Sequence, residues 1–186
     1  MLAAREASGR AIAFGGGVML RWIVRLVSWL MRSTTSMASG SGASALSDGL
    51  AKVLSDTYTL LGKTHGFHWN VTGAQFHSLH EMFEEQYTDL TTAVDEIAER
   101  IRALGYFAPG SLSQFLKLST IEDEHGVPDA RGMLEQLVRD NETVTQACRA
   151  VVGICEEAND TVTEDLMNHR MDAHEKAAWM LRSSMS

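Results

Sequence analysis

Proline is scarce in this sequence of 186 residues, and its two prolines, Pro109 and Pro128, fall in one short window. β-Sandwiches and barrels need such turn residues at frequent intervals, so their scarcity elsewhere in the sequence favours long helices. Apolar residues make up 45% of the chain and charged residues 22%, which is typical of a globular protein rather than a disordered or fibrous one. We therefore expect a single all-α domain.

Cysteine is also scarce, and its placement argues against a disulfide framework. Cys148 and Cys155 are seven residues apart, which on one helix is a rise of about 10.5 Å and too far for a disulfide. A reducing compartment fits this pattern, so we expect a cytoplasmic location. No apolar run reaches the ~20 residues that a membrane-spanning helix needs, so we expect no membrane partner.

Positive charge is in short supply, since 16 basic residues face 24 acidic ones and the net charge is −8. Nucleic-acid-binding domains are usually basic, so the composition does not favour general DNA affinity. The charge is unevenly spread: residues 1–36 carry five basic residues and one acid, and residues 37–186 carry 11 basic and 23 acidic residues, a net charge of −12. The basic residues of the first segment are Arg5, Arg10, Arg21, Arg25 and Arg32.

Glycine concentrates near the N-terminus, with seven of its 15 occurrences in the first 50 residues. This composition, which includes the Ser-Gly-Ser-Gly stretch at 39–42, does not bury a core. We expect residues 1–45 to be a flexible extension and residues 46–186 to be the folded domain. Residues 19–31 are apolar and basic, which fits an interfacial anchor or an organellar transit peptide; alternatively, translation starts at Met37.

Two long helices are expected in the first half of the folded domain. From Leu46 to Trp69 the apolar residues recur every three or four positions, which is the period of an amphipathic helix. A second helix should start at a capping box formed by Thr72 and Gln75 and end at Gly105. Its apolar stripe is the longest in the chain and comprises Phe76, Leu79, Phe83, Tyr87, Leu90, Val94, Ile97, Ile101 and Leu104.

Two further helices are expected in the second half. One follows Pro128 and runs through Cys155, and the other opens at a capping box formed by Thr161 and Glu164. Residues 105–128 contain both prolines and form one long connection, with a short helix near 113–118. Short links within each helix pair and one long crossover between the pairs predict a ferritin-like four-helix bundle.

Four histidines lie close together around the turn between the first two helices, namely His65, His68, His77 and His80. Taken alone, they are also compatible with polar-face or capping residues. The carboxylates favour a metal site, because Glu84 lies four residues after His80 and therefore shares its helix face. Asp95 and Glu99 form a second pair with the same spacing on the same helix.

The spacing of these pairs requires two chains. His80 and Asp95 are 15 residues apart, a rise of about 22 Å, so the two pairs cannot bind one ion within a single chain. They can meet if the helix lies antiparallel to its own copy across a two-fold axis. His68 precedes the turn by about as much as His80 follows it, so the two lie at similar heights. Mixed imidazole and carboxylate donors suit iron.

Three segments at these positions resemble one known family. They are KTHGFHWNVTG at 63–73, LHEMF at 79–83 and DEIAERIRALG at 95–105, and HEKAAWML at 174–181 adds to the likeness. Over about residues 45–184 the sequence resembles the Dps-type mini-ferritins, the starvation DNA-protection family of bacteria. Members of this family form hollow dodecamers that oxidise Fe²⁺, preferably with hydrogen peroxide, and store the ferric mineral inside.

The resemblance implies a ferroxidase whose site is shared between subunits. By this likeness one subunit supplies His68, His80 and Glu84, its mate supplies Asp95 and Glu99, and together they hold iron. Trp69 is expected beside the site. Many members have aspartate where this chain has Glu84, so the resemblance predicts the first iron position better than the second.

A different function is implied by the basic terminal arms through which some members bind DNA. If the arginines of residues 1–36 are present on each subunit, twelve arms would add avidity for phosphate, and the protein would be a nucleoid-coating shell. The acidic remainder of the chain favours the iron-storing enzyme over this alternative.

Other residues carry weaker signals. Glu122 and His125 have a Glu-x-x-His spacing, but their loop position favours a chance match. Trp179 and the methionines are expected in the core, and His169 and His174 as packing or surface residues. Four acids near the start of the last helix either form a solvated cap or line iron-entry pores, as in the family: Glu157, Asp160, Glu164 and Asp165.

Overall fold

The computed structural model describes residues 40–186, which form five helices and no strand. The helices are α2 (Gly40–Asn70), α3 (Phe76–Ala103), α4 (Leu112–Leu118), α5 (Ala130–Ala158) and α6 (Thr161–Ser183). This confirms the all-α prediction for that part of the chain. The arginine-rich segment 1–36 lies outside the described residues, and α2 begins at Gly40, before the boundary expected at residue 46. No helix within 40–186 is long and apolar enough to cross a membrane.

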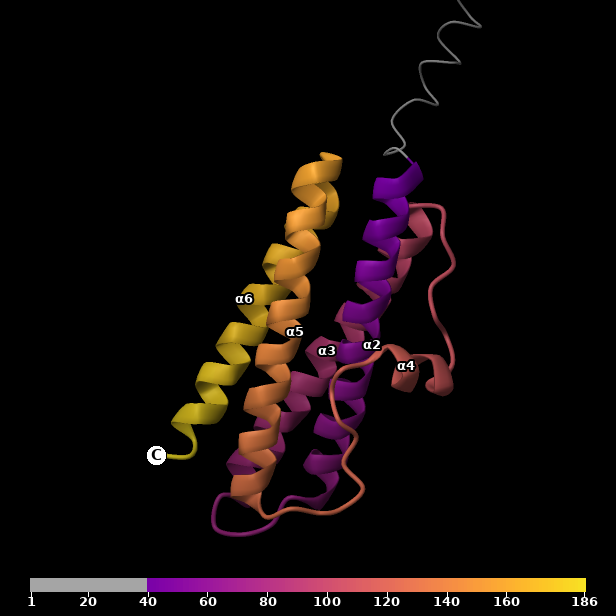
Figure 1. The fold of residues 1–186 in the computed structure, drawn as a ribbon. Coiled ribbons are helices and arrows are strands. Elements are labelled where there is room, and N and C mark those ends of the chain that lie inside the picture. Colours follow the sequence, from indigo (N-terminus) through magenta and orange to yellow (C-terminus); the bar gives the residue numbers. More distant parts are fainter. Residues whose placement is uncertain (1–39) are drawn as a thin grey trace, which may run out of the picture. The chain divides into compact units, whose positions relative to one another are not determined.

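The four long helices form a bundle of two antiparallel pairs (Figure 1). A short turn joins α2 to α3, and a shorter one joins α5 to α6. The pairs meet where α2 packs on α5, while α3 approaches α6 only loosely. One long segment crosses from α3 to α5 and carries α4, which packs on α2. The predicted four-helix bundle with a long crossover is therefore confirmed.

The apolar stripes predicted from the sequence face the centre of this bundle. On α3 the buried members are Leu79, Phe83, Leu90, Ile97 and Ile101. The apolar side of α5 is buried, and both cysteines lie on it as free thiols; its members are Leu134, Leu137, Val138, Val144, Cys148, Val151 and Cys155. Burial raises the pKa of the Cys148 thiol to about 12 and that of Cys155 to about 11, so both are unreactive near neutral pH.

Two expectations about individual apolar residues are wrong. Trp179 was expected in the core, but it is 62% exposed, because its position on α6 faces away from the buried Ala178 and Leu181. Phe76, at the start of the α3 stripe, is 46% exposed, because it is the first residue of α3 and follows the exposed turn of residues 72–75.

Both capping boxes predicted for long helices are also wrong. Helix α3 begins at Phe76 rather than at Thr72, because Gly73 adopts φ of +106° and its carbonyl accepts from the Phe76 amide, which closes a turn. Helix α6 is capped by Asp160 instead of Thr161, with the Asp160 carboxylate accepting from the Thr163 amide.

The end of α3 is as predicted. Gly105, with φ of +92°, follows the helix, and the Tyr106 amide donates to the Ile101 carbonyl at 3.2 Å. The Gly105 amide donates to the Arg102 carbonyl at 3.0 Å, which completes a Schellman motif. The short helix of the crossover also matches its prediction and begins at a capping box of Ser111 and Gln114.

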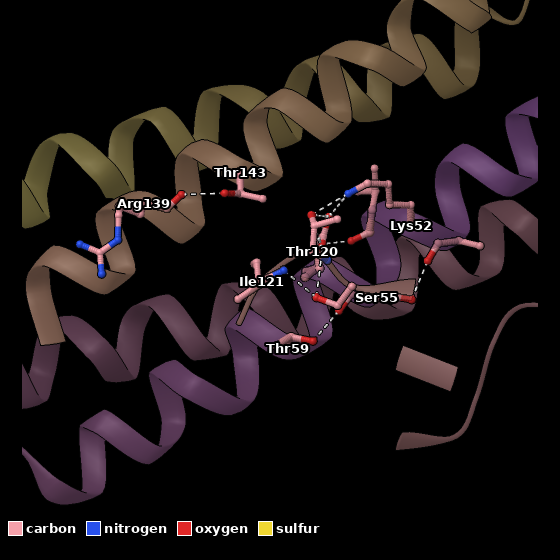
Figure 2. Close-up of polar contacts among 12 residues, drawn as sticks. Lys52, Ser55, Thr59, Thr120, Ile121, Arg139 and Thr143 are labelled. Atoms are coloured by element: carbon pink, nitrogen blue, oxygen red, sulfur yellow. Dashed lines mark hydrogen bonds and ion pairs between the residues drawn. The ribbon is translucent and has the colours of Figure 1, made fainter. Parts of the chain in front are cut away.

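The crossover is fixed to α2 by one buried carboxylate. Asp56, which is fully buried, accepts from the Thr120 amide at 2.6 Å and from the Ser119 hydroxyl at 2.9 Å. Lys52 donates to Asp56 at 2.7 Å and to the Thr120 hydroxyl at 2.8 Å. Figure 2 shows Lys52 and Thr120 pointing toward one another from α2 and the crossover. These contacts set the position of the segment that follows α4.

Candidate metal centre

Two histidines from neighbouring helices meet at the end of the bundle where α2 turns into α3. His68 lies in the last turn of α2 and is 8% exposed, and His80 lies in the second turn of α3. Their rings stack with centroids 3.7 Å apart. The turn of residues 71–75 brings the two helices back at the same height, so residues twelve apart in sequence are in contact.

Each of these histidines is oriented by the backbone of the other. His68 Nδ1 lies 2.8 Å from the His80 carbonyl oxygen, and His80 Nδ1 lies 2.8 Å from the His68 carbonyl oxygen. A carbonyl oxygen only accepts, so both Nδ1 atoms must carry the proton. In the neutral ring this tautomer leaves the lone pair on Nε2, which is the atom that a metal would bind.

Glu84 adds an oxygen donor to the pair. It follows His80 by one helical turn, and ligand atoms of His68, His80 and Glu84 lie within 4.8 Å of one another. No other group of three histidine, cysteine or acidic residues approaches so closely in the described part of the chain. Glu122 and His125, the second spacing noted in the sequence, belong to no such group. Two imidazoles and a carboxylate form a donor set that suits Fe²⁺.

Asp95 and Glu99 do not join this group. Both side chains are exposed on α3. Asp95, the nearer of the two to His80, is 15 residues from it, which is about 22 Å along the helix axis. Their assignment to a site in a second copy stays a prediction. Glu99 and His169 line an open depression between α3 and α6, together with Glu96 and Asp165.

Aromatic rings surround the histidines. Trp69 is 66% exposed, and its ring contacts His65, with centroids 4.2 Å apart, rather than His68. His65 also stacks on Tyr87 at 4.2 Å, and Tyr87 meets His68 edge-on at 5.2 Å. The sequence pattern predicts Tyr87 only as a member of the apolar stripe of α3, and not as a neighbour of the histidines. Its position seven residues after His80, on the same helix face, is the signal that places it near the site.

Asp160 stabilises the start of α6 through hydrogen bonds and lies outside the group of three candidate ligands. Burial alone would raise the pKa of Asp160, but hydrogen bonds from Thr163 and Arg100 lower it below its usual value. Arg100 donates to both Asp160 carboxylate oxygens, at 2.8 and 2.7 Å. Asp160 is therefore engaged as a helix cap, which weakens its case as a pore residue.

His174 belongs to a buried network between α3, α5 and α6. It is 2% exposed, and its Nδ1 donates to the Asn141 side-chain oxygen at 2.8 Å. Arg170 lies 3.4 Å from His174 Nε2 and pairs with Asp89 at 2.7 Å. Burial lowers the pKa of His174 to about 3, so the ring is neutral near neutral pH. The packing role expected for His174 agrees with this environment.

Comparisons with known proteins give one family. The profile of the ferritin-like domain matches residues 47–186. A low temperature-induced protein of Nostoc, itself uncharacterised, is 46% identical over 132 residues, which cover 70% of this chain and 74% of that protein. The DNA protection during starvation protein 2 of Bacillus anthracis is 38% identical over 137 residues, covering 74% of this chain and 94% of that protein.

A solved structure shows the same relationship. The Dps protein of Vibrio cholerae, described as a member of a broad superfamily of ferritin-like diiron-carboxylate proteins, superposes with a TM-score of 0.76 at 32% identity. The match covers 78% of this chain and 92% of that one. The family profile, the identity to a starvation protein and this shared fold agree with one another, and the chain belongs to the ferritin-like family as a Dps-type mini-ferritin.

Proposed function

We propose that this protein stores and detoxifies iron: it oxidises Fe²⁺ with hydrogen peroxide at sites shared between subunits and keeps the ferric mineral in a hollow dodecamer. By removing iron and peroxide together it protects DNA from oxidative damage. The observation that carries the proposal is the convergence of His68, His80 and Glu84, with ligand atoms within 4.8 Å and with Nδ1 of both imidazoles held by a backbone carbonyl.

Iron is the substrate of this reaction, and the donor set of the three residues fits it. Neutral nitrogens bind ferrous iron well, while the Glu84 oxygen suits the ferric product. Two Fe²⁺ ions supply two electrons and the solvent supplies two protons, so that one hydrogen peroxide is reduced to two water molecules and no hydroxyl radical is released. The residues of the chain position the ions and keep the imidazoles in the binding tautomer.

Three ligands from one chain leave the site incomplete, and the proposal takes the rest from a second copy. Asp95 and Glu99 are exposed and therefore free to reach a neighbouring subunit. If α3 lies antiparallel to its own copy, the His80 end of one helix meets the Asp95 end of the other. Each two-fold contact would then build two identical sites.

The proposal is tested by replacing the nitrogen donors. His68→Ala and His80→Ala each remove a neutral donor and leave the apolar stripe of α3 intact, so we expect the peroxide-driven oxidation of Fe²⁺ to fall about tenfold or more. The rate is followed by the absorbance of the ferric product, and assembly is checked by sedimentation.

His77→Ala is the matched control, because His77 is an exposed histidine on the same helix and outside the group of three. It should keep the parental rate. Parental rates in the two site variants, in shells that assemble normally, would mean that iron is oxidised elsewhere in the protein.

A further inference from the structure

A cavity of about 240 Å³ lies between α3 and α6, closer to the α2–α3 turn than the depression lined by Glu99. Helices α3 and α6 pack only loosely on one another, which leaves room for it. Its apolar lining comes from both helices and comprises Met82, Leu90, Ala173, Ala177 and Met180. A cavity of roughly 150 Å³ can hold a benzene ring, so this one has room for a ring with a small substituent.

The cavity lies on the side of α3 that faces away from the candidate metal centre. Gln86, which lines it, follows Glu84 by two residues, and this is a rotation of about 200° around the helix axis. A second copy that completes the metal centre through α3 therefore does not cover the cavity. The cavity also takes no part in the proposed iron oxidation.

A carboxylate in the cavity wall is fixed by a buried arginine. Arg170 of α6, whose side chain is 3% exposed, donates to the two carboxylate oxygens of Asp89 at 3.3 and 2.7 Å. The Asp89 side chain nevertheless stays 53% exposed and lines the cavity. A carboxylate has about four acceptor positions, so Asp89 can accept a further hydrogen bond from a molecule in the cavity.

The charges around the cavity balance, which favours an uncharged ligand. Arg170 offsets Asp89, and the exposed Glu85 and Lys176 carry opposite charges. His174, which also lines the cavity, is neutral near neutral pH. A ligand that carries a hydrogen-bond donor but no net charge fits this lining.

We propose that this cavity binds a small uncharged phenol, with its ring between Met82 and Met180 and its hydroxyl donating to Asp89. Methionine thioethers make favourable contacts with aromatic rings, and these two methionines come one from each helix. A hydroxyl that donates to a carboxylate forms a charge-assisted hydrogen bond, which is stronger than one between neutral groups. This inference goes beyond iron oxidation and does not depend on it.

The test compares phenol with toluene, which has the same ring and a methyl group in place of the hydroxyl. Saturation-transfer NMR titrations of the assembled full-length protein give both dissociation constants, and we expect that of phenol to be about 1 mM or lower. Asp89→Asn keeps the shape of the side chain and removes its charge. It should weaken phenol binding about fivefold or more and leave toluene binding within about twofold.

Two further variants locate the binding. Ala177→Phe places a ring in the cavity and should abolish the binding of both compounds, in shells whose assembly is checked by sedimentation. Asp172→Asn, at an exposed aspartate of α6 outside the cavity, is the matched control and should change neither constant.

The proposal is overturned if the parent binds no phenol, in which case the cavity holds water only. Equal phenol binding by the parent and by Ala177→Phe would also overturn it, because the compound would then bind elsewhere. Unchanged phenol binding by Asp89→Asn, or equal losses for phenol and toluene, would overturn the contact between the hydroxyl and Asp89.

Discussion

Hydrogen bonds decide what the histidines at the candidate centre and in the bundle interior can do. At the candidate centre, backbone carbonyls hold a proton on Nδ1 of His68 and of His80, so in the neutral rings Nε2 is the nitrogen that can bind a metal. In the bundle interior, His174 uses both nitrogens within the protein, towards Asn141 and Arg170. The same side chain is thus available as a ligand in one place and committed to packing in the other.

The neutral state of His174 makes the stability of the fold pH-dependent. In the unfolded chain this histidine takes up a proton below its ordinary pKa of 6.5, whereas in the fold its pKa is about 3. The unfolded state therefore binds more protons between these values, and stability falls as the pH drops through this window. From pH 7 to pH 5 the loss from this group is about 2 kcal/mol.

Denaturant unfolding at pH 7 and pH 5 measures this loss. His174→Gln cannot titrate and should lose about 2 kcal/mol less than the parent over that interval. Asp89, the acid nearest the network, contributes little there: burial would raise its pKa, but Arg170 keeps it below its ordinary value of 3.8. Equal losses in parent and variant would contradict the neutral, buried state of His174.

At the scale of elements, the periodic stripes predict the helices because each buried face repeats every three or four residues. The ends of the helices depend on backbone angles and long-range hydrogen bonds, which the periodicity of apolar residues does not reveal. The turn before α3 is set by the positive φ of Gly73, and the cap of α6 is held by Arg100, 60 residues away. His80 and Glu84 were grouped by helical spacing, but the contacts of His65 with Tyr87 depend on how α2 packs on α3, which spacing along one helix does not encode.

The hydrogen bonds between Asp56 of α2 and the crossover should contribute to the stability of the fold. Asp56→Ala leaves the Thr120 amide and the Ser119 hydroxyl without their buried acceptor, so we expect the free energy of unfolding to fall by about 2–4 kcal/mol. Asp48→Ala, an exposed aspartate of the same helix, is the matched control and should change it by about 0.5 kcal/mol or less. Similar losses in both variants would show that Asp56 does not anchor the crossover.

The whole molecule has its charge divided between two parts of the sequence. Residues 37–186 carry a net charge of −12, and residues 1–36 carry five arginines against one acid. The acidic part repels phosphate and attracts metal cations, which agrees with iron rather than DNA as its ligand. The alternative function, a shell that binds DNA through a basic arm, depends only on the arginine-rich segment.

DNA binding is therefore expected to depend on that segment. A chain of residues 37–186 should not bind duplex DNA at physiological salt, whereas the full chain should bind with an affinity that falls steeply as salt rises. Mobility shifts of both chains across a salt series measure this. A salt-sensitive shift by the shorter chain would place DNA contacts on the acidic bundle and contradict the account.

The central claim is that each iron site takes ligands from two copies, and mixed assemblies test it most directly. His80→Ala and Asp95→Ala, made separately, damage every site of their own homo-oligomers, so each should oxidise Fe²⁺ poorly. In a mixed pair, one site combines both lesions, while the other takes His80 from the Asp95→Ala chain and Asp95 from the His80→Ala chain and is intact.

Co-expressed mixtures, verified to contain both chains, should therefore regain oxidation at up to about half of the sites in each mixed pair. A site built within one chain cannot recover in this way, because every chain in the mixture carries a lesion. Peroxide-driven Fe²⁺ oxidation by the mixed shells is the decisive measurement. Recovery above both parents is the predicted result, and verified mixed shells with no more activity than the parents would contradict the shared site.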